Sequence, residues 1–346
     1  MTASSADMPS QSHPSEPLPL EPMDPQLKWI QPGGGVICHL ELAWGYWRRM
    51  CLKIFRPGYV RKMAATRKGS FNGCPHEVID PRDLKFYRNQ GGFYWEPQDD
   101  PFRWRDKIPF ARAGMAELMV FSLMTFGPAT GLAILLNCPE AKLAKPLLAA
   151  GWLGVTALTV VGLLIVWFFR NPPRRVPLEP GLVVSPADGK VVLIEEIEHD
   201  EFIGGPAIQI GIFLSIFNVH INRTPVAGRV IGLKYKLGKY LNALRPESAR
   251  ENEQLAVRMQ ETVAPFRRYI IRQITGAIAR RIVCWLKPGD ELTRGEQFGM
   301  IKLGSRTELV MPRDAGLKIR TKIGDKVKAG STILAEYSAE PEKVSL

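Results

Sequence analysis

Cysteine and histidine are both scarce in this chain, with five of each among 346 residues. The cysteines are too scattered, and odd in number, to form a disulfide framework. Two Cys/His pairs, Cys38-His39 and Cys74-Pro-His76, lack the short paired spacing of structural zinc sites, so we expect no metal. Reduced thiols in a reducing compartment are the simplest interpretation. The cysteines are Cys38, Cys51, Cys74, Cys138 and Cys284.

The first 25 residues lack the basic start and the apolar core of a signal peptide. They are rich in Ser and Pro, and we expect residues 1–43 to be a disordered extension. Acidic residues are also under-represented, because 34 Asp and Glu face 46 Lys and Arg and leave a net charge of +12. Such a charge suits an anionic partner. No nucleic-acid-binding module is visible, so we expect an anionic membrane surface and no nucleic acid.

Acids are absent altogether between Trp44 and Lys68, where aromatic residues alternate with cations. Aromatic side chains favour the headgroup zone and cations favour anionic lipid. We therefore interpret residues 44–112 as a basic, aromatic, membrane-proximal region. The alternative is a basic extension packed on the main domain.

Two uncharged apolar runs follow, at Leu118–Asn137 and Leu147–Phe169. Each has about the 20 residues that a helix needs to cross a bilayer. The connection is short, so residues 113–170 are predicted to form a helical hairpin that spans or re-enters the membrane. Arginines and lysines flank both outer ends, which favours a cytoplasmic catalytic domain at the cell membrane. Two buried core helices are the alternative.

Residues 171–346 are β-rich, with short runs of β-branched and apolar residues separated by Gly, Pro or Asp. A helix is expected near 246–254. Lys287-Pro-Gly-Asp-Glu-Leu-Thr-Arg-Gly295 recurs as Lys322-Ile-Gly-Asp-Lys-Val-Lys-Ala-Gly330. This turn-strand-turn unit is also found in lipoyl and biotinyl carriers. The predicted fold is a β-rich α+β, barrel-sandwich (lipoyl/biotinyl-carrier-like) catalytic core preceded by a helical membrane hairpin.

The pair Gly304-Ser305 lies at the end of an apolar, strand-like run. A small residue before a hydroxyl side chain allows an N→O acyl shift, in which the Ser305 oxygen attacks the Gly304 carbonyl carbon. β-Elimination from the resulting ester and hydrolysis of the product would leave a pyruvoyl group. An ordinary turn serine is the alternative interpretation of this pair alone.

Five sequence blocks stand in order between Val166 and Tyr337: Phe168-Phe-Arg-Asn-Pro172, Ser185-Pro-Ala-Asp-Gly-Lys190, Ile212-Phe-Leu-Ser-Ile-Phe-Asn-Val-His-Ile-Asn-Arg-Thr-Pro225, Gly276-Ala-Ile-Ala-Arg-Arg-Ile-Val-Cys-Trp285 and Phe298-Gly-Met-Ile-Lys-Leu-Gly-Ser305. Together they resemble the short bacterial-type branch of the phosphatidylserine decarboxylases. The resemblance implies self-cleavage between Gly304 and Ser305, giving α and β chains that form a heterodimer. It also implies decarboxylation of phosphatidylserine in the bilayer to phosphatidylethanolamine, through a Schiff base with the pyruvoyl cofactor derived from Ser305.

The same resemblance implies catalytic roles for Ser305, His220 and Asp188. His220 would serve self-cleavage, decarboxylation or both, and Asp188 would orient a histidine. The family's His-x-x-His pair reads His220-Ile-Asn-Arg223 here, so the usual assignment of the second histidine as base does not transfer. Arg223, Arg280, Arg281 and Arg306 are candidates for binding the lipid phosphate.

Two other functions are compatible with the residues alone. One is a non-enzymatic, membrane-anchored barrel-sandwich adaptor in which Gly304-Ser305 stays intact. The other is a carrier domain, which is disfavoured because neither repeat unit presents a lysine between small residues or methionines at a hairpin tip. Cleavage of the purified chain separates these functions from the decarboxylase.

Overall fold

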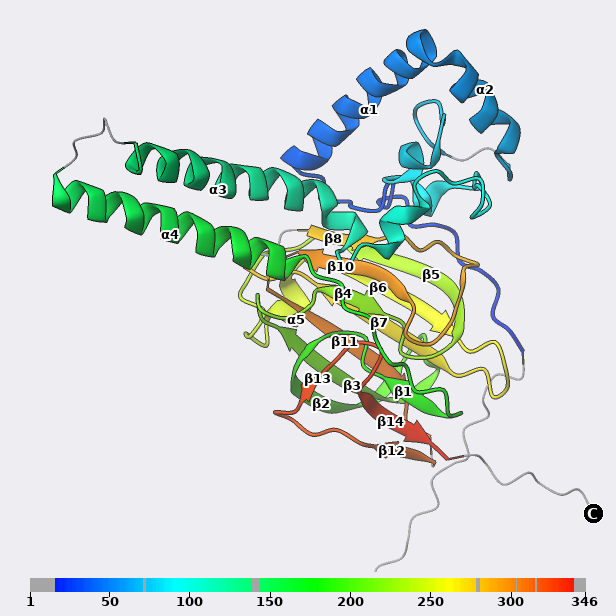
Figure 1. Ribbon diagram of the computed structural model, residues 1–346. Coiled ribbons are helices and arrows are strands. Elements are labelled where there is room, and N and C mark those ends of the chain that lie inside the picture. Colours follow the sequence, from blue (N-terminus) through cyan, green and yellow to red (C-terminus); the bar gives the residue numbers. More distant parts are fainter. Residues whose placement is uncertain are drawn as a thin grey trace, which may run out of the picture. The chain divides into compact units, whose positions relative to one another are not determined.

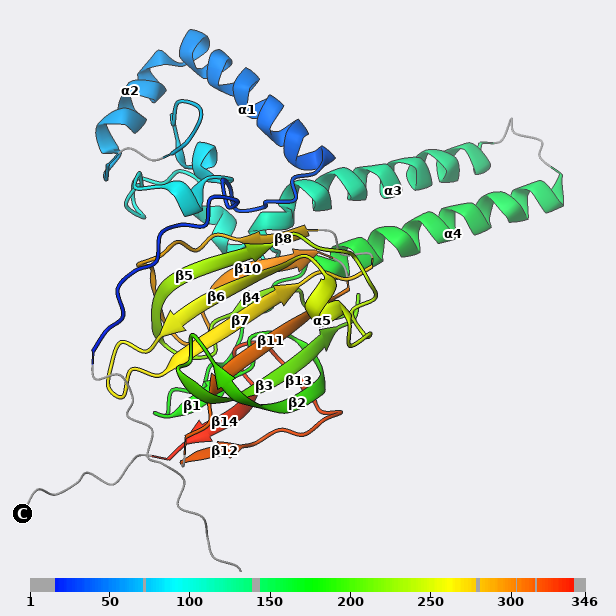
Figure 2. The same ribbon diagram turned by 180° about the vertical axis from the view of Figure 1, so that it is seen from behind.

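A computed structural model describes residues 16–70, 73–138, 144–277, 281–302, 304–314 and 316–338 (Figures 1 and 2). The chain divides into two compact units. The first, called the sheet unit here, comprises Met1–Leu27, Arg174–Ser215 and Asn222–Leu346. The second, called the helical unit, comprises Lys28–Pro173 and Ile216–Ile221.

The sheet unit is built on a curled eight-stranded sheet with the order β13-β2-β3-β11-β7-β6-β5-β9 (Figure 1). Its neighbouring strands are antiparallel. Two three-stranded sheets, β1-β14-β12 and β4-β10-β8, complete the unit together with one short helix. The elements are β1 Leu182–Val184, β2 Gly189–Asp200, β3 Gly205–Leu214, β4 Ile221–Arg223, β5 Gly228–Lys236, α5 Ser248–Glu251, β6 Gln254–Gln260, β7 Arg268–Ile274, β8 Arg281–Cys284, β9 Glu291–Leu292, β10 Gln297–Lys302, β11 Ser305–Pro312, β12 Leu317–Ile319, β13 Lys326–Val327 and β14 Ile333–Tyr337.

The main core lies on one face of this sheet. Ile210, Ile212 and Leu214 recur at every second position of β3 and are fully buried there. Leu309 and Ile271 belong to the same cluster from β11 and β7. A smaller cluster on other strand positions includes Ala207, Ile270 and Val310. The β-rich prediction is therefore confirmed, and the central strands are buried on both faces.

The helix expected over 246–254 is limited to the four residues of α5. Strand β6 starts directly afterwards at Gln254, where Leu255, Val257 and Met259 alternate with less buried residues. This period of two matches a strand that packs on the core. Tertiary packing of that apolar face outweighs the helical spacing of the charged residues before it.

The internal repeat forms two equivalent edges of the eight-stranded sheet. β9 of the first copy pairs with β5, and β13 of the second copy pairs with β2. In both copies the turn glycine has a positive φ, +93° at Gly289 and +102° at Gly324. The amide nitrogens of these two glycines donate to the carbonyls of Val230 and Val191, respectively. The repeat is thus a quasi-twofold feature of the tertiary structure.

Residues 16–27, which the sequence places in the N-terminal extension, lie along the sheet. The Glu21 amide donates to the Ile231 carbonyl of β5 at 2.8 Å. Arg258 on β6 donates to the Glu21 carboxylate, also at 2.8 Å. Leu27 is buried in the main core. These contacts hold the segment against β5 and β6.

The helical unit contains a long helical hairpin, α3 and α4, as the apolar runs predicted. Both helices are long and apolar enough to cross a membrane. Gly162 lets them approach closely, because a Cβ there would lie 2.6 Å from the Phe126 ring. α3 continues through Pro128 without interruption. The elements of this unit are α1 Val36–Phe55, α2 Pro57–Thr66, η1 Pro81–Leu84, η2 Arg88–Gln90, η3 Arg103–Lys107, η4 Arg112–Gly114, α3 Met115–Leu136 and α4 Lys145–Phe168.

Candidate active site

Ser305 is the first residue of β11, in the middle of the eight-stranded sheet. It lies opposite Leu214 of β3. Its side chain is fully buried, and within the described part of the chain its Oγ has no hydrogen-bond partner. Burying a hydroxyl in this way costs about 1–3 kcal/mol. An unsatisfied buried group calls for an explanation, and a catalytic role is one that the native structures of proteins provide.

The preceding residue, Gly304, adopts a left-handed backbone with φ +60°. A Cβ would meet no atom within 4 Å there, so the backbone conformation itself is what favours glycine. The Gly304 carbonyl oxygen lies against the Cα of Gly276, where an added Cβ would approach it to 2.2 Å. Two glycines therefore set the position of the carbonyl that Ser305 would attack.

A chain of buried amide and hydroxyl groups lies on the same face of β11 as Ser305. Thr307, two residues along the strand, accepts a hydrogen bond from Asn222 Nδ2 at 3.0 Å. Asn222 Oδ1 in turn accepts from Gln273 Nε2 at 2.9 Å. All three side chains are fully buried. Sequence reasoning did not select them, although Asn222 stands within the 212–225 block and Thr307 lies two residues after Ser305.

Arg306 points to the opposite face of β11. Its Nε lies 2.8 Å from Glu308 Oε1, and both side chains are almost completely buried. Arg272 of β7 adds a second, longer pair to Glu308 at 3.5 Å. Gly211 makes room for the guanidinium, since a Cβ there would lie 2.8 Å from Arg306 Nη2. The charge of Arg306 is therefore already balanced within the protein.

Asp188 lies in the turn before β2 and is paired with an arginine. Its carboxylate accepts hydrogen bonds from Arg174 Nη2 and from the Ala329 amide, each at 2.8 Å. Arg223 is nearby and donates from Nη1 to the Gly295 carbonyl at 2.9 Å. Burial, helped by Arg174 and opposed by Asp188, lowers the pKa of Arg223. The structure thus brings Asp188 and Arg223 together, and among the described contacts of Asp188 there is no histidine.

His220 lies in the 216–221 segment of the helical unit. Its ring is fully buried and sits 4.6 Å from the Phe168 ring at the end of α4. Nδ1 is 2.9 Å from the Asn218 carbonyl oxygen, which can only accept, so Nδ1 carries the proton and Nε2 is the basic atom. Burial, with a smaller contribution from Arg170, lowers the pKa of His220 to about 4. The imidazole is therefore neutral at physiological pH.

The remaining predicted phosphate ligands are Arg281 and Arg280. Arg281 begins β8 and lies opposite Lys302 of β10, the strand that leads to Gly304. Arg280 lies outside the described residues.

Comparisons with known proteins identify the family of this chain. The phosphatidylserine decarboxylase family matches residues 161–335, from within α4 to β14. The chain belongs to this family. A phosphatidylserine decarboxylase proenzyme of Rhodopirellula baltica is 50% identical over 254 residues, which cover 73% of this chain and 99% of the relative. Proenzymes of the same name from Syntrophus aciditrophicus and Desulfotalea psychrophila are 39% and 38% identical, over 66% of this chain and 97% of each relative.

These findings confirm the resemblance seen in the sequence blocks. The matched region contains the complete eight-stranded sheet, Gly304-Ser305 and the 212–225 block that carries His220. Residues 28–160 of the helical unit, which include α3 and most of α4, lie before the region that the family matches.

Proposed function

We propose that this enzyme decarboxylates phosphatidylserine to phosphatidylethanolamine, using a pyruvoyl group formed from its own Ser305. Family membership supports the reaction. The observation that carries the mechanism is the buried Ser305 hydroxyl, which has no hydrogen-bond partner in the described ranges, beside a Gly304 carbonyl that two glycines hold in place. A turn serine in solvent would have neither feature.

In the proposed self-cleavage, Ser305 Oγ attacks the Gly304 carbonyl carbon. The C–N bond breaks, the nitrogen takes a proton, and the Gly304 acyl group becomes an ester on Oγ. Loss of the Ser305 Cα proton and rupture of the Cβ–Oγ bond then release a Gly304 carboxylate. Water converts the remaining dehydroalanine to a pyruvoyl group and ammonia. The site fits this sequence because the nucleophile is desolvated and its Oγ has no hydrogen-bond partner among the residues that the structure describes.

The pyruvoyl group supplies the electron sink that decarboxylation of an amino acid headgroup needs. We propose that His220 is the proton-transferring side chain of self-cleavage, decarboxylation or both, because it is neutral and basic at Nε2. We keep Asp188 as a proposed catalytic residue, and its pairing with Arg174 holds the 185–189 turn in place. Arg223 and Arg281 remain our phosphate ligands, whereas the Glu308 pairing leaves Arg306 a structural role.

Cleavage would leave a β chain ending at Gly304 and an α chain starting at residue 305. We propose that the two stay together as a heterodimer. β11 of the α chain pairs along its length with β3 and along most of it with β7, both of the β chain. β14 likewise pairs with β1. The new chain end would thus remain inside the sheet.

The hairpin of α3 and α4, within residues 113–170, is proposed to anchor the enzyme in the cell membrane. Cations lie before α3 and after α4, at Arg103, Arg105, Arg170 and Arg174. By the positive-inside rule these flanks, and the decarboxylase domain over 171–346, face the cytoplasm. We further propose a barrel-sandwich core, supported by the quasi-twofold pairing of β9 and β13.

Denaturing electrophoresis and intact mass of the purified chain test the proposal. The expected result is a large fragment ending at Gly304 and a small fragment with a blocked N-terminus. A single uncut chain that decarboxylates lipid would refute the pyruvoyl mechanism. An uncut chain without activity would favour the adaptor.

A further inference from the structure

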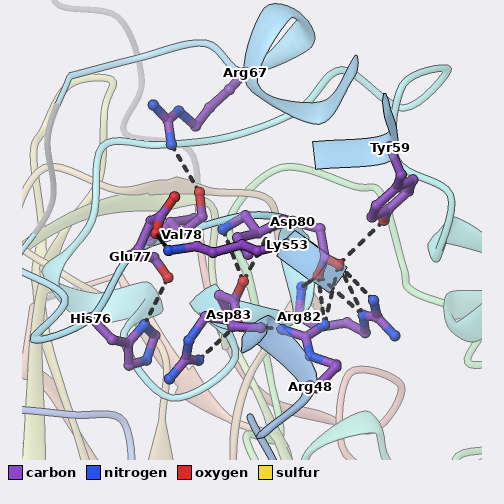
Figure 3. Close-up of polar contacts among 12 residues, drawn as sticks. Arg48, Lys53, Tyr59, Arg67, His76, Glu77, Val78, Asp80, Arg82 and Asp83 are labelled. Atoms are coloured by element: carbon purple, nitrogen blue, oxygen red, sulfur yellow. Dashed lines mark hydrogen bonds and ion pairs between the residues drawn. The ribbon is translucent and has the colours of Figure 1, made fainter. Parts of the chain in front are cut away.

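Helix α1 is oriented with its charged residues inward. Arg48 Nη1 pairs with Asp80 Oδ1 at 2.9 Å (Figure 3). Arg49 Nη1 pairs with Asp83 Oδ1 at 3.0 Å. Both carboxylates are almost completely buried. Two turns of helix earlier, Glu41 pairs with Lys85. These ion pairs fasten one face of α1 to the segment that contains η1.

The carboxylate of Asp80 contacts side chains of both α1 and α2. Arg82 donates to it at 2.6 Å and Tyr59 of α2 at 3.2 Å (Figure 3). Burial by itself would raise the pKa of Asp80, but hydrogen bonds and charge from Arg82 and Arg48 lower it below its usual value. Burial and the Asp80 charge raise the pKa of Tyr59 to about 12. The orientation of α1 about its own axis is therefore well determined.

The opposite face of α1 is apolar and exposed. Its members recur every three or four positions, as residues on one helix face do. Trp44 and Trp47, whose ring centroids are 5.2 Å apart, are 60% and 54% exposed. We call this face the α1 stripe; it consists of Val36, Leu40, Trp44, Trp47, Met50 and Ile54, all exposed in the structure. A surface helix of a protein in water normally turns its apolar face to the protein and its charged face to the solvent.

We propose that the α1 stripe lies in the headgroup zone of an anionic bilayer, parallel to the membrane surface. Tryptophan favours this zone, and the charged face is already satisfied by protein. Residues 36–68 contain eight Lys and Arg and one acid, Glu41, which Lys85 neutralises. Arg56, Arg61 and Lys62, at the end of the stripe, are exposed. This complementarity selects anionic lipid over an apolar protein surface.

The same unit carries α3 and α4, which supply the proposed membrane anchor, so α1 would be a second attachment. The inference rests on the proposed membrane association and does not depend on self-cleavage or turnover. An enzyme whose substrate is a bilayer lipid gains from two attachments, because one anchor leaves its orientation free.

Quenching of tryptophan fluorescence by brominated lipids tests the inference in the full chain. The protein is reconstituted into vesicles of phosphatidylcholine and phosphatidylglycerol brominated near the headgroup end of the acyl chains. Replacing Trp44 and Trp47 by Phe should remove part of the quenchable signal. Trp95→Phe is the matched control, because Trp95 is buried and should contribute no quenchable signal. The Arg61→Glu, Lys62→Glu double variant should reduce quenching of Trp44 and Trp47.

Unchanged quenching in the Trp44→Phe, Trp47→Phe variant would overturn the inference. So would cross-linking of two copies through the stripe in vesicles, which would make a second copy its occupant. Because fluorescence is read without substrate, the same measurement on Ser305→Ala separates a failed membrane contact from a failed decarboxylase mechanism.

Discussion

Gly276→Ala is expected to block self-cleavage while leaving the sheet unit folded. The added Cβ would lie 2.2 Å from the Gly304 carbonyl oxygen, whereas ordinary contact begins near 3.4 Å. Either Gly276 or the carbonyl has to move by about 1 Å, and a misplacement of that size costs a reaction roughly a hundredfold in rate. Because Ser305 is fixed at the start of β11 by its pairing with β3, it cannot follow the carbonyl freely.

The assay is a time course of chain splitting on denaturing gels during cell-free synthesis. Hydroxylamine adds a second measurement, since it cuts an accumulated ester but not an amide. The variant should stay uncut with and without hydroxylamine, because ester formation is the step that fails. Gly316→Ala is the matched control, since a Cβ there would meet only ordinary contacts of about 3.5 Å. A Gly276→Ala chain that splits at the wild-type rate with a normal unfolding transition would refute this account of the site.

Three further predictions concern other residues. Ser305→Ala should remain a single chain of 38.7 kDa and produce no phosphatidylethanolamine. Detection of a split chain or of phosphatidylethanolamine would contradict the pyruvoyl mechanism. The pKa of His220 is about 4 in the folded protein and 6.5 in the unfolded chain, so as pH falls the unfolded chain binds the proton first. The contribution of the neutral imidazole to stability is therefore present above pH 6.5 and is lost as pH falls toward 4. His220→Asn should therefore show a smaller loss than wild type in unfolding free energy between pH 7 and 5, by about 2 kcal/mol, and equal losses would argue against a buried neutral imidazole. Glu308→Leu leaves Arg306 buried without its partner and should cost about 3–5 kcal/mol, whereas the Arg306→Met, Glu308→Leu double variant should be much closer to wild type in thermal unfolding. Additive effects of these two substitutions would show that the pair is not coupled.

Much of the fold was readable because local patterns and tertiary packing agree. Short runs of β-branched and apolar residues bounded by Gly, Pro or Asp predicted the strands of residues 171–346, and the uncharged runs predicted α3 and α4. The repeat was visible because its turns need glycine at positive φ, which leaves a fixed mark in the sequence. β6 was missed because charged residues at helical spacing precede it, and only its place between β5 and β7 makes the alternation decisive.

The sequence by itself determined which family the chain belongs to and which residue we propose as the nucleophile, because Gly304-Ser305 and its companion blocks are each contiguous in the chain. Contacts between distant segments were decided only by the tertiary structure. Three such contacts join residues that are far apart in the sequence. They are Gly276 with the Gly304 carbonyl, the hydrogen-bonded chain of Gln273, Asn222 and Thr307, and the pairing of Asp188 with Arg174. The outward direction of the α1 stripe is likewise set by the ion pairs that the opposite face of α1 makes with Asp80 and Asp83. The helical period of the sequence does not specify that direction.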